Sequence, residues 1–164
     1  MNAAHDSMPP PAVEIRRKSI LSATASRLIG ALNAELLERY PEDGTTDHFS
    51  LDAREVEHGR GAFLVVYRHG APIGCGAVRC LDADTAEIKR MFVELDSRGH
   101  NLGQVLLAAL EAEAKQLGIT RLVLETGPRQ PEANAVYRRA GFVPIAAFGE
   151  LQEHPLSTFL GKAL

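Results

Sequence analysis

Residues 87–107 read Glu87-Ile-Lys-Arg-Met-Phe-Val-Glu-Leu-Asp-Ser-Arg-Gly-His-Asn-Leu-Gly-Gln-Val-Leu-Leu107, and the fold is organised around them. The stretch predicts a β-strand, a tight loop rich in arginine and glycine, and the first turns of a long amphipathic helix. Unpaired backbone N–H groups at the start of a helix, together with the helix dipole, form a site for a phosphate or pyrophosphate. The loop is therefore the first candidate for a binding site.

Helices and strands are expected to alternate around this stretch. Apolar residues spaced three and four apart, together with proline and glycine at the ends, predict helices at about 19–40, 102–117 and 131–140. Runs rich in β-formers predict strands at 13–16, 62–67, 72–79, 85–93, 121–126, 142–145 and 156–160, with a hairpin at His69-Gly70 and a turn at 82–84. The helix between strands 85–93 and 121–126 should place those two strands parallel.

The pattern predicts an α+β fold with a mixed, mostly antiparallel sheet flanked by helices on both faces. Residues 12–164 are expected to form a single domain. Residues 1–11, which are small, polar and rich in proline, are expected to be a disordered tail. A short helix is expected at 52–58, within a polar stretch between Pro41 and Gly61.

Composition excludes several classes of protein. The 164 residues carry a net charge of −3, which is unlike the basic surface of a nucleic-acid binder. There is no apolar run of about 18 residues for a membrane span and no apolar centre of a signal peptide near Met1, so a cytoplasmic protein is expected. Cys75 and Cys80 point to opposite faces of a strand, and no His/Cys cluster has the spacing of a metal site.

Three segments together resemble one protein family. The loop Arg98-Gly99-His100-Asn101-Leu102-Gly103 lacks the patterns of a P-loop and of a dinucleotide-binding loop. It resembles motif A of the GNAT superfamily of acyl-CoA-dependent N-acetyltransferases, written Arg/Gln-x-x-Gly-x-Gly/Ala. Residues 87–93 resemble the fourth strand of that family, and residues 124–127 and 133–142 resemble its fifth strand and the helix after it. The three segments occur in the family's order within residues 60–145.

The resemblance implies acetyl-CoA as cosubstrate, lying between the separated fourth and fifth strands. Backbone groups of Met91, Phe92 and Val93 would pair with the pantetheine arm. Gln130 stands where many family members have an asparagine that helps to hold this arm, and its longer amide side chain would be a further contact. The amides of Arg98, Gly99, His100, Asn101, Leu102 and Gly103 would hold the pyrophosphate. The alternative is that the loop only turns the chain and caps a helix.

Asn101 stands where the family has a glycine. Asparagine tolerates unusual backbone angles better than most other residues, so the loop is expected to keep its shape. Arg138 and Arg139 would contact the 3′-phosphate of CoA or serve only as surface charges.

Two residues would carry the chemistry implied by the resemblance. Glu87 matches the position of a general base in several family members, but it is also expected to lie opposite Arg79 in the hairpin, where it would form a salt bridge. Tyr137 matches a tyrosine that protonates the CoA sulfur, and the alternative is a core tyrosine that holds its helix on the sheet, since Tyr137 and Phe142 flank Gly141. His48 and His100 are candidate bases or exposed loop histidines.

The sequence therefore predicts transfer of acetyl from acetyl-CoA to a primary amine of a small molecule or peptide by direct attack, without a metal. Two other functions stay open. One is a non-catalytic sensor or interaction module that binds acyl-CoA, and the other is an acyltransferase with another acyl donor or an alcohol acceptor. Segments 41–61 and 146–157 should shape the acceptor site. An exposed edge strand near the C-terminus makes a homodimer a further expectation.

Overall fold

In the computed structural model, residues 12–43 and 50–164 are described, and a seven-stranded sheet runs through them in the order β1-β2-β3-β4-β5-β7-β6. The strands are β1 Val13–Arg17, β2 Gly61–Arg68, β3 Ala71–Cys80, β4 Thr85–Val93, β5 Arg121–Thr126, β6 Val143–Pro144 and β7 Thr158–Ala163. Among these described strands, β4 and β5 pair in parallel, and the other neighbouring strands pair antiparallel. The predicted sheet, with its parallel step, is confirmed.

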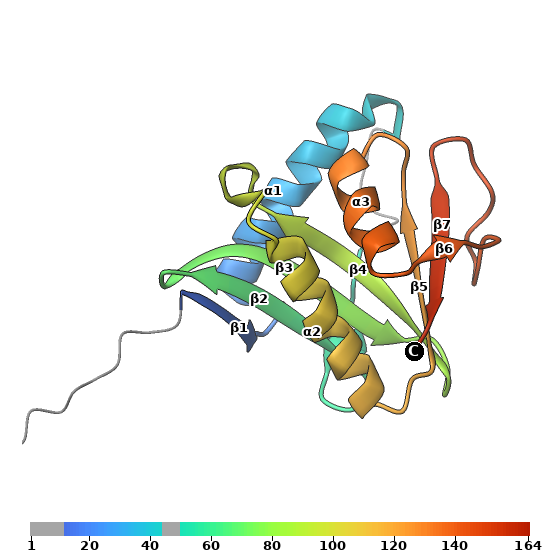
Figure 1. Ribbon diagram of the computed structural model, residues 1–164, viewed down its shortest axis with the longest axis horizontal. Helices are drawn as coiled ribbons and strands as arrows, with labels where there is room; N and C mark the ends of the chain where they lie inside the picture. The colour runs from blue at the N-terminus through green and yellow to red at the C-terminus, as the bar shows by residue number, and fades with distance from the viewer. Residues whose placement is uncertain (1–11, 44–49) are drawn as a thin grey trace, which may run out of the picture.

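Helices cover both faces of the sheet, as predicted (Figure 1). Helix α1 Ala23–Arg39 lies on one face, and α2 Leu102–Gln116 and α3 Pro131–Arg139 lie on the other. Helix α1 begins later than expected because the Ser22 hydroxyl accepts a hydrogen bond from the Ala25 N–H at 3.2 Å and so caps the helix. The described residues also include the short 3₁₀ turns η1 Pro41–Asp43, η3 Ala53–Val56 and η4 Leu95–Ser97.

The sheet separates two apolar clusters. One lies between the sheet and α2 and includes Leu106 and Leu110, which are fully buried. The other lies under α1 and includes Leu28, Leu32 and Phe63. This division follows from the strand period of two, which sends alternate side chains to opposite faces. The same alternation determines on which face of the sheet each polar side chain of β4 and β5 lies.

Strands β4 and β5 separate part-way along their length. Their paired positions run only from Thr85 opposite Arg121 to Ile88 opposite Leu124, although β4 continues to Val93. A bulge accompanies the separation, since Ala77 and Cys75 of β3 face Lys89 and Phe92 of β4. Arg90 lies within this bulge of β4, and its φ of 55° lies in the left-handed region. The gap between the strands opens at the centre of the molecule.

Several boundaries differ from the prediction. The closing strand β6 is only two residues long, because Phe142 turns into the core beside Tyr137 and the ring of Pro144 removes a hydrogen-bond donor. Strand β7 starts at Thr158 rather than at 156, because Thr158 lies opposite Thr126, the last residue of its partner strand β5. The hairpin at His69-Gly70 is confirmed, with positive φ at both residues.

The expected tail at 1–11 and His48 lie outside the described residues. Within the described ranges, no helix is long and apolar enough to cross a membrane.

Candidate active site

Two cavities meet where β4 and β5 separate. The first has a volume of about 370 Å³ and lies between α1, the end of β4, the loop before α2, and α3. The second, of about 740 Å³, lies against β3, β4, β5 and the segment before β7. Leu32, Met91 and Gln130 line both. We call them the loop cavity and the acid cavity.

The loop cavity contains most of the residues that the sequence predicts for cofactor binding. Its lining includes Met91, Phe92, Val93, Arg98, Gly99, Asn101, Leu102, Gly103, Gln130 and Arg139. His100 belongs to the same loop but not to the lining, and its ring nitrogen lies 3.2 Å from the Ser97 carbonyl oxygen. The structure therefore brings together the segments from β4, the loop and α3.

The loop backbone leaves the start of α2 accessible. Asn101 is the N-cap residue of α2 and has left-handed backbone angles, with φ 62° and ψ 17°, and its side chain makes no capping hydrogen bond. Asparagine is one of the few residues with a side chain that adopts this conformation readily. Gly103 allows α2 to approach α3, because a Cβ there would lie 3.1 Å from a methyl group of Val136. The N–H groups of the first turn stay available for an anion.

Charged side chains span the mouth of the loop cavity. The Arg98 guanidinium donates to the Val93 carbonyl at 2.8 Å and to Glu35 of α1 at 2.9 Å. Arg39 of α1 joins the same Glu35 and also Glu132 of α3, at 3.0 Å from the latter. This network connects both helices across the cavity and holds the guanidinium of Arg98 at its edge.

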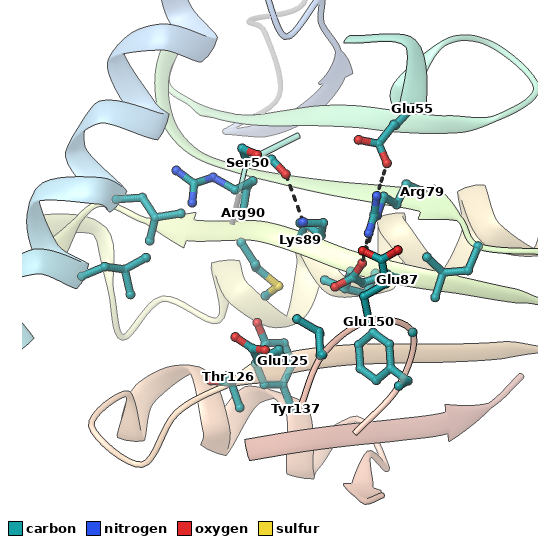
Figure 2. Close-up of a pocket in the computed structure, with 18 of the residues that line it drawn as sticks. Ser50, Glu55, Arg79, Glu87, Lys89, Arg90, Glu125, Thr126, Tyr137 and Glu150 are labelled. Atoms are coloured by element: carbon teal, nitrogen blue, oxygen red, sulfur yellow. Dashed lines mark hydrogen bonds and ion pairs between the residues drawn. The ribbon is translucent and has the colours of Figure 1, made fainter. Parts of the chain in front are cut away.

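In the acid cavity, Glu87 forms the salt bridge that the sequence predicts. Arg79 Nε donates to Glu87 Oε1 at 2.9 Å, and Arg79 also pairs with Glu55 of η3. Figure 2 shows Arg79 between these two carboxylates. Glu87 is 4% exposed, so its charge is held in the wall of the cavity by this arginine. A role as base stays a prediction.

A second glutamate, which the sequence analysis left without a role, faces the same space. Glu125 follows Leu124, the last residue of β5 that pairs with β4, and it lines the acid cavity. Burial, followed by the nearby Glu87 carboxylate, raises the pKa of Glu125 above its ordinary value. The alternation of buried Leu122 and Leu124 along β5 is the signal that could have placed Glu125 on the opposite face.

Tyr137 of α3 packs in the core and also reaches the acid cavity, and its role as a proton donor stays a prediction. Its ring packs on Phe142 with centroids 5.8 Å apart, and it also lines the acid cavity. Figure 2 shows Tyr137 and Glu125 together on one side of this cavity. Burial raises the pKa of Tyr137, so its hydroxyl stays protonated and available as a proton donor.

The segments expected to shape an acceptor site do line these cavities. Ser50 and Glu55 come from the stretch after α1, and Phe148, Glu150 and Leu151 from the stretch before β7. A smaller cavity of about 230 Å³ adjoins them and shares Glu125, Thr126, Gln130 and Leu151 with the acid cavity. Within the described residues, no group of three or more His, Cys, Asp or Glu side chains is placed to hold a metal ion.

Comparison with known proteins agrees with this geometry. The sequence model of the Acetyltransferase (GNAT) family matches residues 29–142. The chain belongs to the GNAT family. It is therefore an acyltransferase of the acetyl-CoA-dependent type, and the resemblance found in the sequence is confirmed.

Individual relatives of this GNAT chain match it over nearly its full length. An IAA acetyltransferase from Azospirillum brasilense is 37% identical over 155 residues, covering 94% of this chain and 99% of the relative. A structure from Klebsiella pneumoniae assigned to the acyl-CoA N-acyltransferases has a TM-score of 0.78 and 33% identity, covering 93% and 97% of the two chains. A GNAT acetyltransferase from Elizabethkingia anophelis with acetyl-CoA bound has the same fold, with a TM-score of 0.65, 19% identity, and 94% and 99% coverage.

Proposed function

We propose that this GNAT chain transfers acetyl from acetyl-CoA to a primary amine of a small molecule or peptide by direct attack. The observation that carries the proposal is the meeting of the loop cavity and the acid cavity at Met91 and Gln130, in the gap between β4 and β5. The loop cavity suits the cosubstrate, and the acid cavity suits an ammonium group. The reacting groups would meet where the two cavities join.

The residues of the loop cavity fit acetyl-CoA. Asn101 in its left-handed conformation and Gly99, with φ 86°, turn the loop so that the amides at the start of α2 are free for the pyrophosphate. The end of β4, from Met91 to Val93, has no partner on the β5 side and offers backbone groups there to the pantetheine amides. The Val93 carbonyl already accepts from Arg98, and Phe92 is paired with Cys75 of β3, which leaves the backbone groups of Met91 as the main contact. When bound, acetyl-CoA supplies an activated thioester.

The acid cavity fits the acceptor amine. Free amines are mostly protonated at neutral pH, so the acceptor must lose a proton before it attacks. Glu87 and Glu125 place two carboxylates beside the gap. Glu125, whose pKa burial raises, is the stronger candidate for receiving that proton, while Glu87, held by Arg79, contributes negative charge. Tyr137 then donates its proton to the departing thiolate.

A thiol-release assay with acetyl-CoA and a panel of primary amines tests the proposal. We expect thiol release that depends on the amine, with mass spectrometry showing an N-acetylated product. Binding of acetyl-CoA without release on any amine would contradict amine acetylation. Release on alcohols alone, with an ester product, would replace the amine acceptor by an alcohol.

A further inference from the structure

Lys89 and Arg90, two cations in the wall of the acid cavity, are paired with neutral groups. Lys89 Nζ donates to the Ser50 carbonyl oxygen at 3.1 Å, and the Arg90 guanidinium donates to Asn33 Oδ1 of α1. Arg79, the third cation of the cavity, is bound by two carboxylates. Across residues 12–43 and 50–164, neither Lys89 nor Arg90 forms an ion pair. Among the described residues, the cavity thus holds one cation bound by two carboxylates and two cations whose hydrogen-bond partners are neutral.

Holding these cations in the protein costs free energy. Arg90 is only 8% exposed, and burial lowers the pKa of both Lys89 and Arg90. The carboxylates of Glu87 and Glu55 act on Lys89 in the opposite direction, but both are engaged by Arg79. A desolvated cation without a paired anion is unfavourable unless a ligand supplies one.

The backbone of β4 is distorted so that both cations reach the same side of the sheet. In a regular strand, neighbouring residues point to opposite faces. The bulge interrupts that alternation at Arg90, and its φ of 55° is a conformation that costs a residue with a side chain free energy. As a result, Lys89 and Arg90 both lie on the α1 side of the sheet, where Arg90 contacts Asn33. Figure 2 shows Lys89 and Arg90 near Ser50, the hydrogen-bond partner of Lys89.

We propose that Lys89 and Arg90 bind a carboxylate of the acceptor, while Glu125 and Glu87 hold its amine. The acceptor would then be a small amino acid or similar amino-carboxylate. This inference rests on the proposed function, since it names the acceptor of the same site.

The charges of the cavity support a ligand with one charge of each sign. Arg79 shared between Glu55 and Glu87 leaves one negative charge, and Glu125 adds a second when it is ionised. Lys89 and Arg90 supply two positive charges, and Glu150 is exposed to solvent. A zwitterion keeps this balance, whereas a doubly charged phosphate would upset it.

Matched pairs of ligands test the carboxylate site. Each of the 20 standard amino acids would be compared with its primary amide, tryptophan also with tryptamine, and 4-aminobutyrate with butylamine. Each ligand would be titrated calorimetrically into the CoA-loaded protein and assayed for turnover. For at least one pair we expect the acid to bind about 10- to 100-fold more tightly than its partner, the range of a charge-assisted hydrogen bond. Equal binding throughout, or preference for the uncharged partner in every pair, would overturn the proposal.

Variants of Lys89 assign the effect to the site. Lys89→Met should raise KM for the preferred acid about tenfold or more while leaving KM for its amide unchanged, and Lys89→Arg should restore most of the loss. Lys115→Met, on the exposed face of α2, is the matched control and should change neither. Lys89→Met should melt at the same or a higher temperature, because it removes a partly buried charge. An equal rise in KM for acid and amide would overturn the carboxylate contact.

The two proposals fail in different ways. If acids bind through Lys89 but no amine is turned over, the carboxylate site is supported and the proposed reaction is contradicted. If amines are turned over without any preference for acids, the proposed reaction is supported and the carboxylate site is contradicted.

Discussion

Glu125 occupies a position that costs stability and serves the proposed reaction. We expect Glu125→Gln to lower kcat by about 10²-fold or more, the usual contribution of a general base. Glu87→Gln should lower it less and should also destabilise the fold, because Arg79 loses one of its two carboxylates. The measurement is the amine-dependent rate of thiol release for both variants. A larger loss for Glu87→Gln would make Glu87 the base.

The difference in stability between Glu125→Gln and the unsubstituted protein should depend on pH. Because burial raises the folded-state pKa of Glu125, the folded protein holds this proton more tightly than the unfolded chain does. The stabilising contribution of the protonated side chain is present below the ordinary carboxyl pKa of 4.5 and is lost as pH rises through the raised value. Glu125→Gln should therefore gain stability relative to the unsubstituted protein across that window, as denaturant unfolding at several pH values would show. A gain independent of pH would contradict this.

Tyr137→Phe removes only the hydroxyl oxygen of Tyr137, so it distinguishes the proposed catalytic role of this residue from its role in packing. The phenyl ring keeps the contact with Phe142, so acetyl-CoA affinity should stay within about twofold, while kcat falls about 10²-fold or more through loss of the proton donor. Tyr67→Phe, on β2, is a control that should change neither quantity. An unchanged kcat for Tyr137→Phe would remove this residue from the mechanism.

The loop before α2 depends on the backbone of Asn101 rather than on its side chain. Asn101→Gly should bind acetyl-CoA at least as tightly as the unsubstituted protein, because glycine adopts φ 62° without strain. Asn101→Val should weaken binding, since a left-handed conformation costs such a residue about 1–2 kcal/mol or more. Calorimetric titration with acetyl-CoA measures both. Equal losses for the two variants would show that the asparagine amide itself is needed.

The connection between β5 and α3 depends on a close contact with α1. A Cβ at Gly127 would lie 2.2 Å from the Tyr40 hydroxyl, which itself accepts a hydrogen bond from the Arg129 N–H at 2.9 Å. Gly127→Ala should therefore lower the free energy of unfolding by about 1–3 kcal/mol. Adding Tyr40→Phe should cost less in this background than alone, because the hydroxyl that clashes is removed. Denaturant unfolding of the four proteins measures this, and strict additivity would contradict the contact.

At the scale of elements, the sequence predicts most of what local patterns determine. The order of strands and helices, the parallel step across α2 and the pairing of Glu87 with Arg79 all follow from periodicity and turn signals. The bulge at Arg90 does not, because its place depends on how β3 and β4 pair over their whole length. The positions of Lys89 and Arg90 on one face therefore could not be predicted, because a regular strand would send these two side chains to opposite faces.

At the scale of the whole molecule, the site forms where elements distant in sequence converge. The acid cavity draws residues from β3, β4, β5, α3 and the segment before β7 (Figure 2), and no local motif encodes that convergence. The sequence could name Glu87 and Tyr137 only through the family resemblance, and it gave Glu125 no role.

The C-terminal edge of the sheet is short. It is the two-residue strand β6, with Pro144 in it, and a short edge that contains proline discourages pairing with another chain. The expectation of an exposed edge strand that needs a partner is therefore weaker than the sequence suggested, and dimerisation stays a prediction.

A crystal structure of the protein with CoA tests the central claim most directly, because that claim is a placement. We predict the pyrophosphate on the amides between Arg98 and Gly103, the pantetheine along Met91 and Phe92, and the CoA sulfur within hydrogen-bonding distance of the Tyr137 hydroxyl, facing Glu125 across the gap between β4 and β5. A pantetheine arm that lies outside this gap, or a sulfur far from Tyr137, would contradict the account.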